Sequence, residues 1–261
     1  HPILKFKNLF ARIKGRVLNE VIDTEHLPIY LDLIAKVKPD IIHIHGTENS
    51  FGCIIEHTEI PVVVSIQGNI TVCLHKYCSG IEKKYLKLKN FDIKNYKTIL
   101  FPHAFKNDRK KFVRMQKREE KNLKYCKNVI GRTAWDRRIS RILAPERVYF
   151  HNDESLRDSF YKAEWVPQKR EKLILHTTNG NNIYKGFETI CMCLYELNKL
   201  GVDIEWRVAG INSNDLIVKI VKRMLKDKFS NKNLKLLGRL SANALIAKLL
   251  EADIYIMPSH I

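Results

Sequence analysis

The chain has 261 residues and 45% of them are apolar, which is enough for two domains with hydrophobic cores and excludes general disorder. Lys and Arg number 46 against 28 Asp and Glu, and the formal net charge of +18 favours anionic partners such as nucleotides, phosphorylated sugars, nucleic acid or an anionic membrane. A proteome rich in Lys, Asn and Ile would give the same balance. The six cysteines are interpreted as reduced thiols, so we expect a cytoplasmic protein. No apolar run approaches the ~20 residues that span a bilayer, and no signal peptide is visible.

The first half of the chain alternates short apolar runs with polar, Lys-rich segments that are candidate helices. The apolar runs are IIHIH at 41–45, VVVSI at 62–66 and NVIG at 128–131. A short continuous apolar run is typical of a strand buried on both faces of a parallel sheet. We therefore predict three strands here, each followed by a polar loop.

The second half repeats strand and helix with clearer periodicity. Its predicted strands are 172–177, 204–210, 234–238 and 254–259, and helices are predicted around 184–199, around 214–228 and after the capping residue Ser241. This alternation predicts an α/β fold with a parallel sheet and helices on both faces.

A polar segment at 162–172, which contains Pro167, predicts the boundary between two domains, 1–165 and 166–261. The chain starts without Met and stops directly after a predicted strand. We therefore expect a fragment that lacks the first strand of the first domain and the end of the second.

Small or polar residues follow every predicted strand of the second half. In such sheets, ligands bind outside the carboxyl ends of the strands. Lys185 and Gly186 come just as a helix begins, where free backbone N–H groups and the helix dipole favour anions. Lys185 would add a full charge and Gly186 would allow close approach, which together suit a diphosphate. A solvated lysine beside a turn glycine is the alternative.

The order of these pieces resembles the carboxyl-terminal domain of the family 4 glycosyltransferases. The pattern is a small polar loop, K-G-F-E, a strand ending A-G, a strand ending L-L-G-R, and A-D-I-Y-I-M-P-S. The resemblance implies two Rossmann-like domains with parallel sheets facing across a cleft, the GT-B fold, the second domain being incomplete here. It implies that Lys185 contacts the donor diphosphate and is a catalytic residue. The predicted donor-binding residues are Thr178, Asn179, Gly180, Lys185, Gly186, Gly210, Gly238, Arg239, Pro258 and Ser259.

The first domain also resembles this family, so that the likeness spans about residues 35–261. KPDIIHIHGTE at 38–48 is similar to a family stretch whose loop faces the acceptor, and IPVVVSIQG at 60–68 is similar to the strand after it. The segments 128–136 and 151–161 resemble a subgroup of bacterial members. The predicted acceptor-binding residues are His45, Gly46, Glu48, Gln67, Gly68 and Arg132, and His45 is also assigned a catalytic role.

Three departures from the family pattern affect the expected chemistry. Many members have an Arg a few residues before the lysine, where this chain has Thr178-Asn179-Gly180. Many have a His where Gln67 stands, and Gln can hydrogen-bond a sugar but cannot serve as acid or base. The family's pair of glutamates follows the Pro-Ser strand and would lie beyond Ile261, so we expect the 261-residue form to be inactive.

Several polar residues have alternative interpretations. His43 and His45 project to one side of a strand; we expect His45 to line the site and His43 to be a hydrogen-bonded core or supporting residue. A metal site on this pair has no third ligand, and the spacing of Cys73, His75 and Cys78 is a weak signal, so we predict no metal. Glu48 and Arg132 could equally be a surface acid and a structural ion-pair partner. His151 and Glu154 are minor candidates for the site.

The segment 81–125 holds 15 Lys or Arg against five Asp or Glu, with phenylalanines interleaved. Such a surface can hold a protein on the inner face of an anionic membrane, which would suit a lipid-linked acceptor. A solvated helical face is the alternative. Basic residues mixed with aromatics also suit single-stranded nucleic acid, but no nucleic-acid-binding motif is present and we expect none to bind.

The resemblance implies a glycosyltransferase of hexosyltransferase type that retains the anomeric configuration. It would move a sugar from a nucleotide-diphosphate sugar to a saccharide or lipid-linked acceptor in surface polysaccharide or glycolipid synthesis. The resemblance implies no cofactor and no essential metal, and the oligomeric state is open. The alternatives are a nucleotide-sugar epimerase of the same fold, which Gln67 disfavours, and a non-enzymatic polyanion-binding module.

Overall fold

The computed structural model describes residues 26–86, 104–230 and 232–261. The described residues form two four-stranded sheets, and every strand pair within them is parallel. The contacts divide the chain into two compact units. The first unit comprises the described residues up to His75 and those from 104 to Glu154. The second comprises 76–86 and the residues from Ser155 onward.

The first unit is built on a sheet of strand order β1-β2-β3-β4. Its strands are β1 (Ile42–His45), β2 (Val62–Ser65), β3 (Asn128–Gly131) and β4 (Val148–His151). Its helices are α2 (Leu27–Val37), the 3₁₀ helix η1 (Ser50–His57), α3 (Ile70–Lys76), α6 (Ala104–Lys124) and α7 (Ala134–Leu143). The three predicted strands are present, and β4 is an additional strand.

One core cluster joins one face of this sheet to its helices. Ile44, Val64 and Val129 from the strands pack with Leu123 of α6 and Ile54 of η1, and side chains of α2 and α7 pack against the same cluster. The prediction that each strand is buried on both faces holds for β2, whose four residues are all buried. It is wrong for β1, because Ile44 is buried on one face while His43 and His45, on the opposite face, are exposed.

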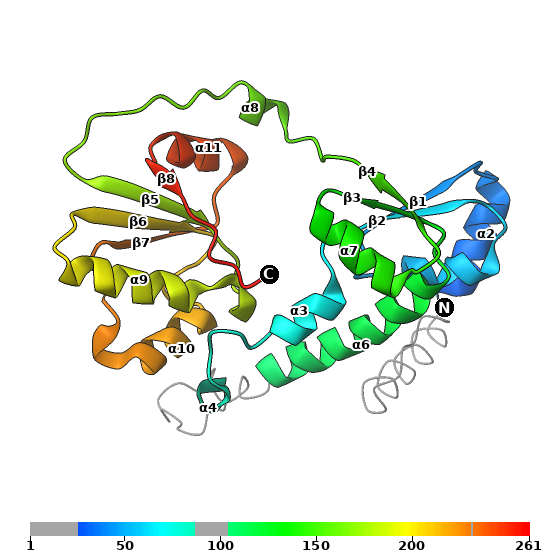
Figure 1. Cartoon of the computed structure of the whole chain (residues 1–261), viewed down its shortest axis with the longest axis horizontal. Helices are drawn as coiled ribbons and strands as arrows, with labels where there is room; N and C mark the ends of the chain where they lie inside the picture. Colours follow the sequence, from blue (N-terminus) through cyan, green and yellow to red (C-terminus); the bar gives the residue numbers. More distant parts are fainter. Residues whose placement is uncertain (1–25, 87–103, 231) are drawn as a thin grey trace, which may run out of the picture. The chain divides into compact units, whose positions relative to one another are not determined.

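The second unit is built on a sheet of strand order β7-β6-β5-β8 (Figure 1). Its strands are β5 (Leu173–Thr178), β6 (Ile204–Ala209), β7 (Leu234–Gly238) and β8 (Ile254–Tyr255). Its helices are α4 (Lys83–Leu86), α8 (Asp158–Tyr161), η2 (Ile183–Lys185), α9 (Phe187–Lys199), α10 (Leu216–Leu225), η3 (Lys226–Lys228) and α11 (Ala242–Leu250). All four predicted strands are present, although β8 is shorter than 254–259.

Helices lie on both faces of this second sheet, with α9 and α10 on one and α11 on the other (Figure 1). Phe187, Ile190 and Leu194 form the buried stripe of α9 that the helical spacing predicts. Ser241 caps α11 as predicted, its hydroxyl accepting the backbone N–H of Ala244 at 3.3 Å. The strand order reverses at β5, because β6 and β7 lie to one side of it and β8 to the other.

The division between the units differs from the proposed boundary at 165/166. Residues 155–165 belong to the second unit because they pack on it. The indole N–H of Trp165 donates to the carbonyl of Ala252 at 2.7 Å, and α8 contacts α11. Residues 76–86 also belong there, since α4 contacts α10.

Candidate functional site

Two loops of the second unit meet where its strand order reverses. Residues 179–186 follow β5 and residues 256–260 follow β8, and these two strands are parallel neighbours. We call these two segments the switch-point loops. Adjacent parallel strands whose connections run to opposite sides leave a crevice at their carboxyl ends, which is where such sheets bind ligands.

Lys185 and Gly186 lie against the loop that follows β8. Gly186 has φ +74°, and a Cβ at this position would lie 2.0 Å from the carbonyl oxygen of Pro258. The backbone N–H of His260 donates to the carbonyl of Tyr184 at 2.9 Å, and the Ser259 hydroxyl donates to the same carbonyl at 3.4 Å. Only glycine fits this close approach of the two switch-point loops.

The predicted helix start differs in detail from the observed one. Lys185 ends the 3₁₀ helix η2, and Gly186, in the left-handed region, is the N-cap residue of α9. Lys185 is half-buried, with its ammonium 5.4 Å from the centre of the Tyr184 ring. Among the described residues it makes no ion pair with a carboxylate, so its charge is available to an anion.

Three further predicted donor residues are tied into the same edge of the sheet. The Asn179 side chain is buried and donates to the carbonyl of Lys185 at 3.0 Å. A Cβ on Gly210 would lie 1.9 Å from the carbonyl oxygen of Asn179, and the Gly210 N–H donates to the carbonyl of Gly238 at 2.6 Å. Asn179, Gly210 and Gly238 therefore fix the backbone at the ends of β5, β6 and β7.

The remaining predicted donor residues lie at the surface of this edge. Thr178 ends β5 and is exposed, Gly180 is half-buried, and Arg239, directly after β7, is exposed. The structure thus brings Asn179, Lys185, Gly186, Pro258 and Ser259 together at the switch-point loops, with Gly210 and Gly238 beside them.

Sequence reasoning missed one pair of residues in this site. The imidazole Nε2 of His260 lies 2.6 Å from Oε1 of Glu188, which is 1% exposed and lies in the first turn of α9. The second carboxylate oxygen, Oε2, is buried and has no hydrogen-bond partner among the described residues. A carboxylate at a helix start can simply stabilise the helix. The pairing with a residue 72 positions away had no signal in the sequence.

The predicted acceptor residues lie at the carboxyl edge of the first unit's sheet. His45 ends β1 and is exposed, with its ring centre 4.1 Å from that of His43. His43 is also exposed, and its Nε2 lies 2.6 Å from the Ser65 hydroxyl. The expectation of a core position for His43 is therefore wrong, although its hydrogen bond is present. Partial desolvation and the neighbouring His45 lower the pKa of His43.

Arg132 and Gln67 are brought together, but through the backbone of Gln67. The Arg132 guanidinium donates to the carbonyl of Gln67 at 2.9 Å and to the Glu154 carboxylate at 3.0 Å. The amide side chain of Gln67 is not the partner in this contact. Gly68 follows it in open space, since a Cβ there would meet nothing within 4 Å. Arg132 therefore links the loop after β3 to the loop after β2, and it also forms a solvent-exposed ion pair with Glu154.

Gly46 and Glu48 form a tight turn after β1. Gly46 has φ +76°, and a Cβ there would lie 2.0 Å from Oε2 of Glu48. The carbonyl of Glu48 accepts a hydrogen bond from the guanidinium of Arg118 on α6. Beside this turn, the Thr47 hydroxyl donates to the buried carboxylate of Glu119, also on α6. The turn is therefore held to α6 by two polar contacts.

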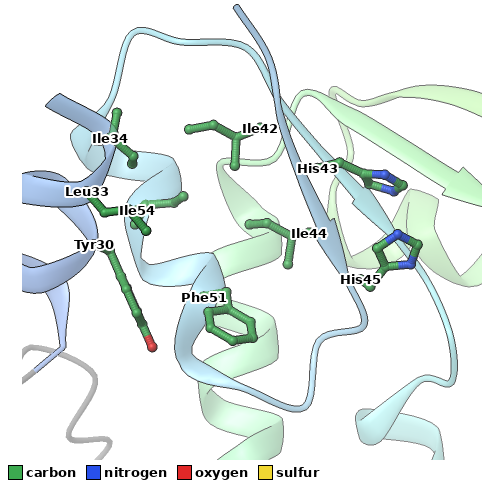
Figure 2. A pocket seen from close by; sticks show the side chains of 9 residues that line it. All are labelled: Tyr30, Leu33, Ile34, Ile42, His43, Ile44, His45, Phe51 and Ile54. Carbon is green, nitrogen blue, oxygen red and sulfur yellow. The ribbon is translucent and has the colours of Figure 1, made fainter. Parts of the chain in front are cut away.

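An apolar cavity of about 430 Å³ lies beside β1, between α2 and η1 (Figure 2). Leu33 and Ile34 of α2, Ile42 and Ile44 of β1, and Ile54 of η1 form its walls. Figure 2 shows His43 and His45 on the opposite side of β1 from Ile42 and Ile44, as alternation along a strand requires. His43 and His45 are nevertheless among the residues that line the cavity, together with Tyr30 and Phe51, so the cavity is not confined to the apolar face of β1.

Other predicted features have simpler outcomes. Residues 87–103 of the basic segment lie outside the described residues; the rest of it includes α4 and α6, and Arg109, Lys110 and Lys111 are exposed. Across the described ranges, no group of three His, Cys, Asp or Glu side chains is placed to hold a metal ion. Within the same ranges, no helix is both long and apolar enough to cross a membrane. His151, a minor candidate for the site, is exposed, and its Nε2 lies 3.3 Å from Oδ1 of Asp153.

Comparison with known proteins gives structural likeness only. No family model and no curated protein sequence matches the chain. Among solved structures, a sucrose-phosphate synthase from Thermosynechococcus elongatus is similar, with a TM-score of 0.61 and 11% identity over 90% of this chain and 55% of that one. A glycosyltransferase from Rickettsia africae is similar, with a TM-score of 0.52 and 14% identity over 91% of this chain and 56% of that one.

These likenesses establish the fold and leave the activity open. The chain has an α/β fold with two parallel sheets of the Rossmann type, as predicted, and it spans about half the length of the structures that it matches. Identities of 11% and 14% are too low to transfer a reaction.

Proposed function

We propose that the chain forms part of a retaining glycosyltransferase that uses a nucleotide-diphosphate sugar and a saccharide or lipid-linked acceptor. The observation that carries this proposal is the meeting of Lys185-Gly186 with Pro258-Ser259 at the point where the strand order of the second sheet reverses. The resemblance to the family 4 glycosyltransferases supports the same assignment and implies retention of anomeric configuration. The fold shared with two sugar-metabolic proteins agrees with it.

Lys185 is suited to stabilise the leaving group. In glycosyl transfer the nucleoside diphosphate gains negative charge in the transition state, and a positioned cation beside a helix start lowers that energy. The ammonium of Lys185 has no carboxylate partner among the described residues, while Gly186 admits a ligand close to the backbone. This arrangement supplies positive charge from the chain itself, so we expect diphosphate binding without a divalent cation.

The acceptor is assigned to the carboxyl edge of the first sheet. His45 and Glu48 offer polar side chains to sugar hydroxyls, and Arg132 is held at this edge by the carbonyl of Gln67. An acceptor with a phosphate or carboxylate would compete with Glu154 for Arg132, whose ion pair is solvent-exposed and therefore weak. The exposed basic residues of α6 are consistent with a lipid-linked acceptor at an anionic membrane.

The test is a thermal-shift and calorimetric screen of nucleoside diphosphates and their sugars on the 261-residue chain, with and without EDTA. We expect at least one nucleoside diphosphate to raise the melting temperature, and Lys185→Ala to weaken its binding about tenfold or more, because a charged contact is worth roughly 1.5–3 kcal/mol. Lys219→Ala is the matched control, since Lys219 is an exposed lysine on α10 of the same unit.

Equal binding by Lys185→Ala and the unsubstituted chain would remove Lys185 from the site. Binding that requires a divalent cation would contradict the proposed role of Lys185 as the main counter-charge. Interconversion of free nucleotide sugars without transfer to an acceptor would favour the epimerase alternative over the transferase.

A further inference from the structure

Four arginines of the first unit surround one hollow that the proposed function does not use. Arg137, Arg138 and Arg141 of α7 line it together with Arg147, which lies just before β4, and the hollow has a volume of about 560 Å³. Ala134 and Pro145 complete its wall. We call this feature the arginine hollow. Its volume lies in the range of sites that bind small ligands, roughly 300–1,000 Å³.

The positive charge of the arginine hollow is not neutralised by the chain. Among the described residues, none of the four guanidinium groups forms an ion pair with a carboxylate. The nearby carboxylate of Asp136 does not neutralise this charge. It is buried and already accepts hydrogen bonds from the backbone N–H groups of Arg132 and Thr133, at 2.9 and 3.0 Å. Burial and the charges of Arg141 and Arg137 lower the pKa of Arg147, which agrees with close, uncompensated cations.

Local structure holds one of these arginines in place. The Nε of Arg147 donates to the hydroxyl of Ser140, which is completely buried, at 3.0 Å, and one of its terminal nitrogens donates to the carbonyl of Arg137 at 2.5 Å. Its guanidinium carbon also lies 5.8 Å from the centre of the Tyr149 ring. A fixed guanidinium loses little freedom when it binds an anion, because its planar donors are already oriented.

The spacing on α7 brings more positive charge to the same place. Arg137 and Arg141 are four residues apart and therefore neighbours on one helical face, where like charges repel. Such repulsion is relieved when a shared anion binds between them. Guanidinium groups pair with phosphate oxygens through two parallel hydrogen bonds, and a phosphate monoester or diphosphate offers enough oxygens for several arginines.

We propose that the arginine hollow is a binding site for a compact phosphate-bearing ligand, of the phosphate monoester or diphosphate class. The concave shape and the concentration of charge on one short helix favour a small polyanion over an extended nucleic acid, which would require a basic stripe along the surface. The phosphate could come from a soluble phosphate ester or from a lipid headgroup, since both present the same chemistry.

The test uses pyrophosphate as the probe. It is carried out on the Lys185→Ala variant, which lacks the diphosphate-binding lysine of the proposed donor site. Calorimetric titration of pyrophosphate into the Lys185→Ala chain, at low ionic strength, isolates the arginine hollow. We expect pyrophosphate to bind at one site. Its affinity should fall at least tenfold in the double variant Arg137→Gln/Arg141→Gln. Arg137→Lys/Arg141→Lys should bind with intermediate affinity, because the charge stays while the paired donors are lost.

Arg223→Gln is the matched control, because Arg223 is an exposed arginine of α10 in the second unit. We expect this control to change the affinity less than twofold. Circular dichroism and the unfolding midpoint check that the double variant is folded, and the Lys variant tests the proposal if the Gln variant is not. If the affinity for pyrophosphate falls equally in the control and the double variant, or falls in neither, the proposal is overturned in favour of non-specific attraction to the basic surface.

The source of the phosphate is distinguished with vesicles. Phosphatidylcholine vesicles with and without phosphatidylglycerol are sedimented with the Lys185→Ala chain. If the ligand is a lipid headgroup, the chain sediments with the anionic vesicles and pyrophosphate releases it; if the ligand is soluble, pyrophosphate binds without such sedimentation. Sedimentation that Arg137→Gln/Arg141→Gln leaves unchanged, without pyrophosphate binding, would contradict a site in the arginine hollow.

Discussion

Gly186 shows how one residue determines the shape of the candidate site. Two separate constraints require glycine at this position: the positive φ and the close approach of the Pro258 carbonyl. Gly201 is subject to the first constraint alone. Gly201 has φ +72°, against +74° for Gly186, but a Cβ there would meet nothing within 4 Å. The two glycines therefore separate the conformational requirement from the steric one.

We predict that Gly201→Ala lowers the free energy of unfolding by about 1–2 kcal/mol, the cost of a left-handed conformation for an L-residue. Gly186→Ala should lower it further, because its Cβ would also collide with a backbone carbonyl that cannot rotate away. Urea unfolding measures both, and thermal shifts with nucleoside diphosphates should be lost only in Gly186→Ala. Equal destabilisation would mean that the loop after β8 does not lie against Gly186.

Two cysteines of α9 differ in environment although they are two positions apart. Cys191 is buried, and burial together with the charge of Glu188 raises its pKa to about 12, whereas Cys193 is exposed. Because the thiolate is the reactive form, we predict that Cys193 is alkylated by iodoacetamide at pH 8 and that Cys191 is not. Peptide mass spectrometry of the folded chain measures this, and a denatured sample, in which both react, is the control. Alkylation of Cys191 in the folded chain would contradict its burial.

At the scale of elements, the periodicity of the sequence predicts most strands and helices of the second unit. Apolar spacing locates α9, and Ser241 marks the start of α11, because both signals are local. The exposed face of β1 has a signal in the sequence, since His43 and His45 alternate with Ile42 and Ile44, but so short a run is equally compatible with a strand buried on both faces. The pair formed by Glu188 and His260 was equally out of reach, because the fold brings the two residues together from distant positions.

Glu119 is the element-scale feature that most clearly holds α6 to the rest of its unit. Its carboxylate is 1% exposed and accepts hydrogen bonds from the backbone N–H groups of Ile70 and Thr71, at 3.0 and 2.8 Å, and from the Thr71 hydroxyl at 2.6 Å. The Thr47 hydroxyl is a further donor. The carboxylate thus joins α6 to the start of α3 and to the turn after β1.

We predict that Glu119→Gln lowers the free energy of unfolding by about 1–3 kcal/mol, because an amide replaces one acceptor oxygen with a donor that faces other donors. Glu120→Gln is the matched control: Glu120 is the exposed neighbour on α6, and its loss should cost less than about 0.5 kcal/mol. Hydrogen exchange should show the loss of protection at Ile70 and Thr71. Unchanged protection there would show that Glu119 does not hold the start of α3.

At the scale of the whole chain, the fold class could be predicted because repeated strand–helix alternation has few solutions. The grouping of 76–86 with the second unit could not be predicted, since it depends on contacts between α4 and α10 that leave no local signal in the sequence.

Net charge is a second property of the whole chain. A formal +18, together with ten histidines that gain charge in acid, means that repulsion within the chain grows as the pH falls.

His176 adds a specific contribution to this pH dependence. It is completely buried in β5, and neither ring nitrogen has a hydrogen-bond partner among the described residues. Burial and the charge of Arg207 lower its pKa below the ordinary value of 6.5, against a smaller opposing effect of Glu251. As the pH falls below about 6.5, the unfolded chain therefore binds a proton at this position before the folded chain does.

The stability that neutral His176 provides is consequently complete above pH 6.5 and is lost as the pH falls toward the folded-state pKa. We predict that the free energy of unfolding decreases between pH 7 and pH 5, and that His176→Leu shows a smaller decrease, by about 1.4 kcal/mol for each pKa unit that separates the two states. Urea unfolding at several pH values measures both slopes. His57→Leu, at an exposed histidine of η1, is the matched control. Identical slopes in all three proteins would show that His176 titrates alike in the folded and unfolded chains, and would contradict its burial beside Arg207.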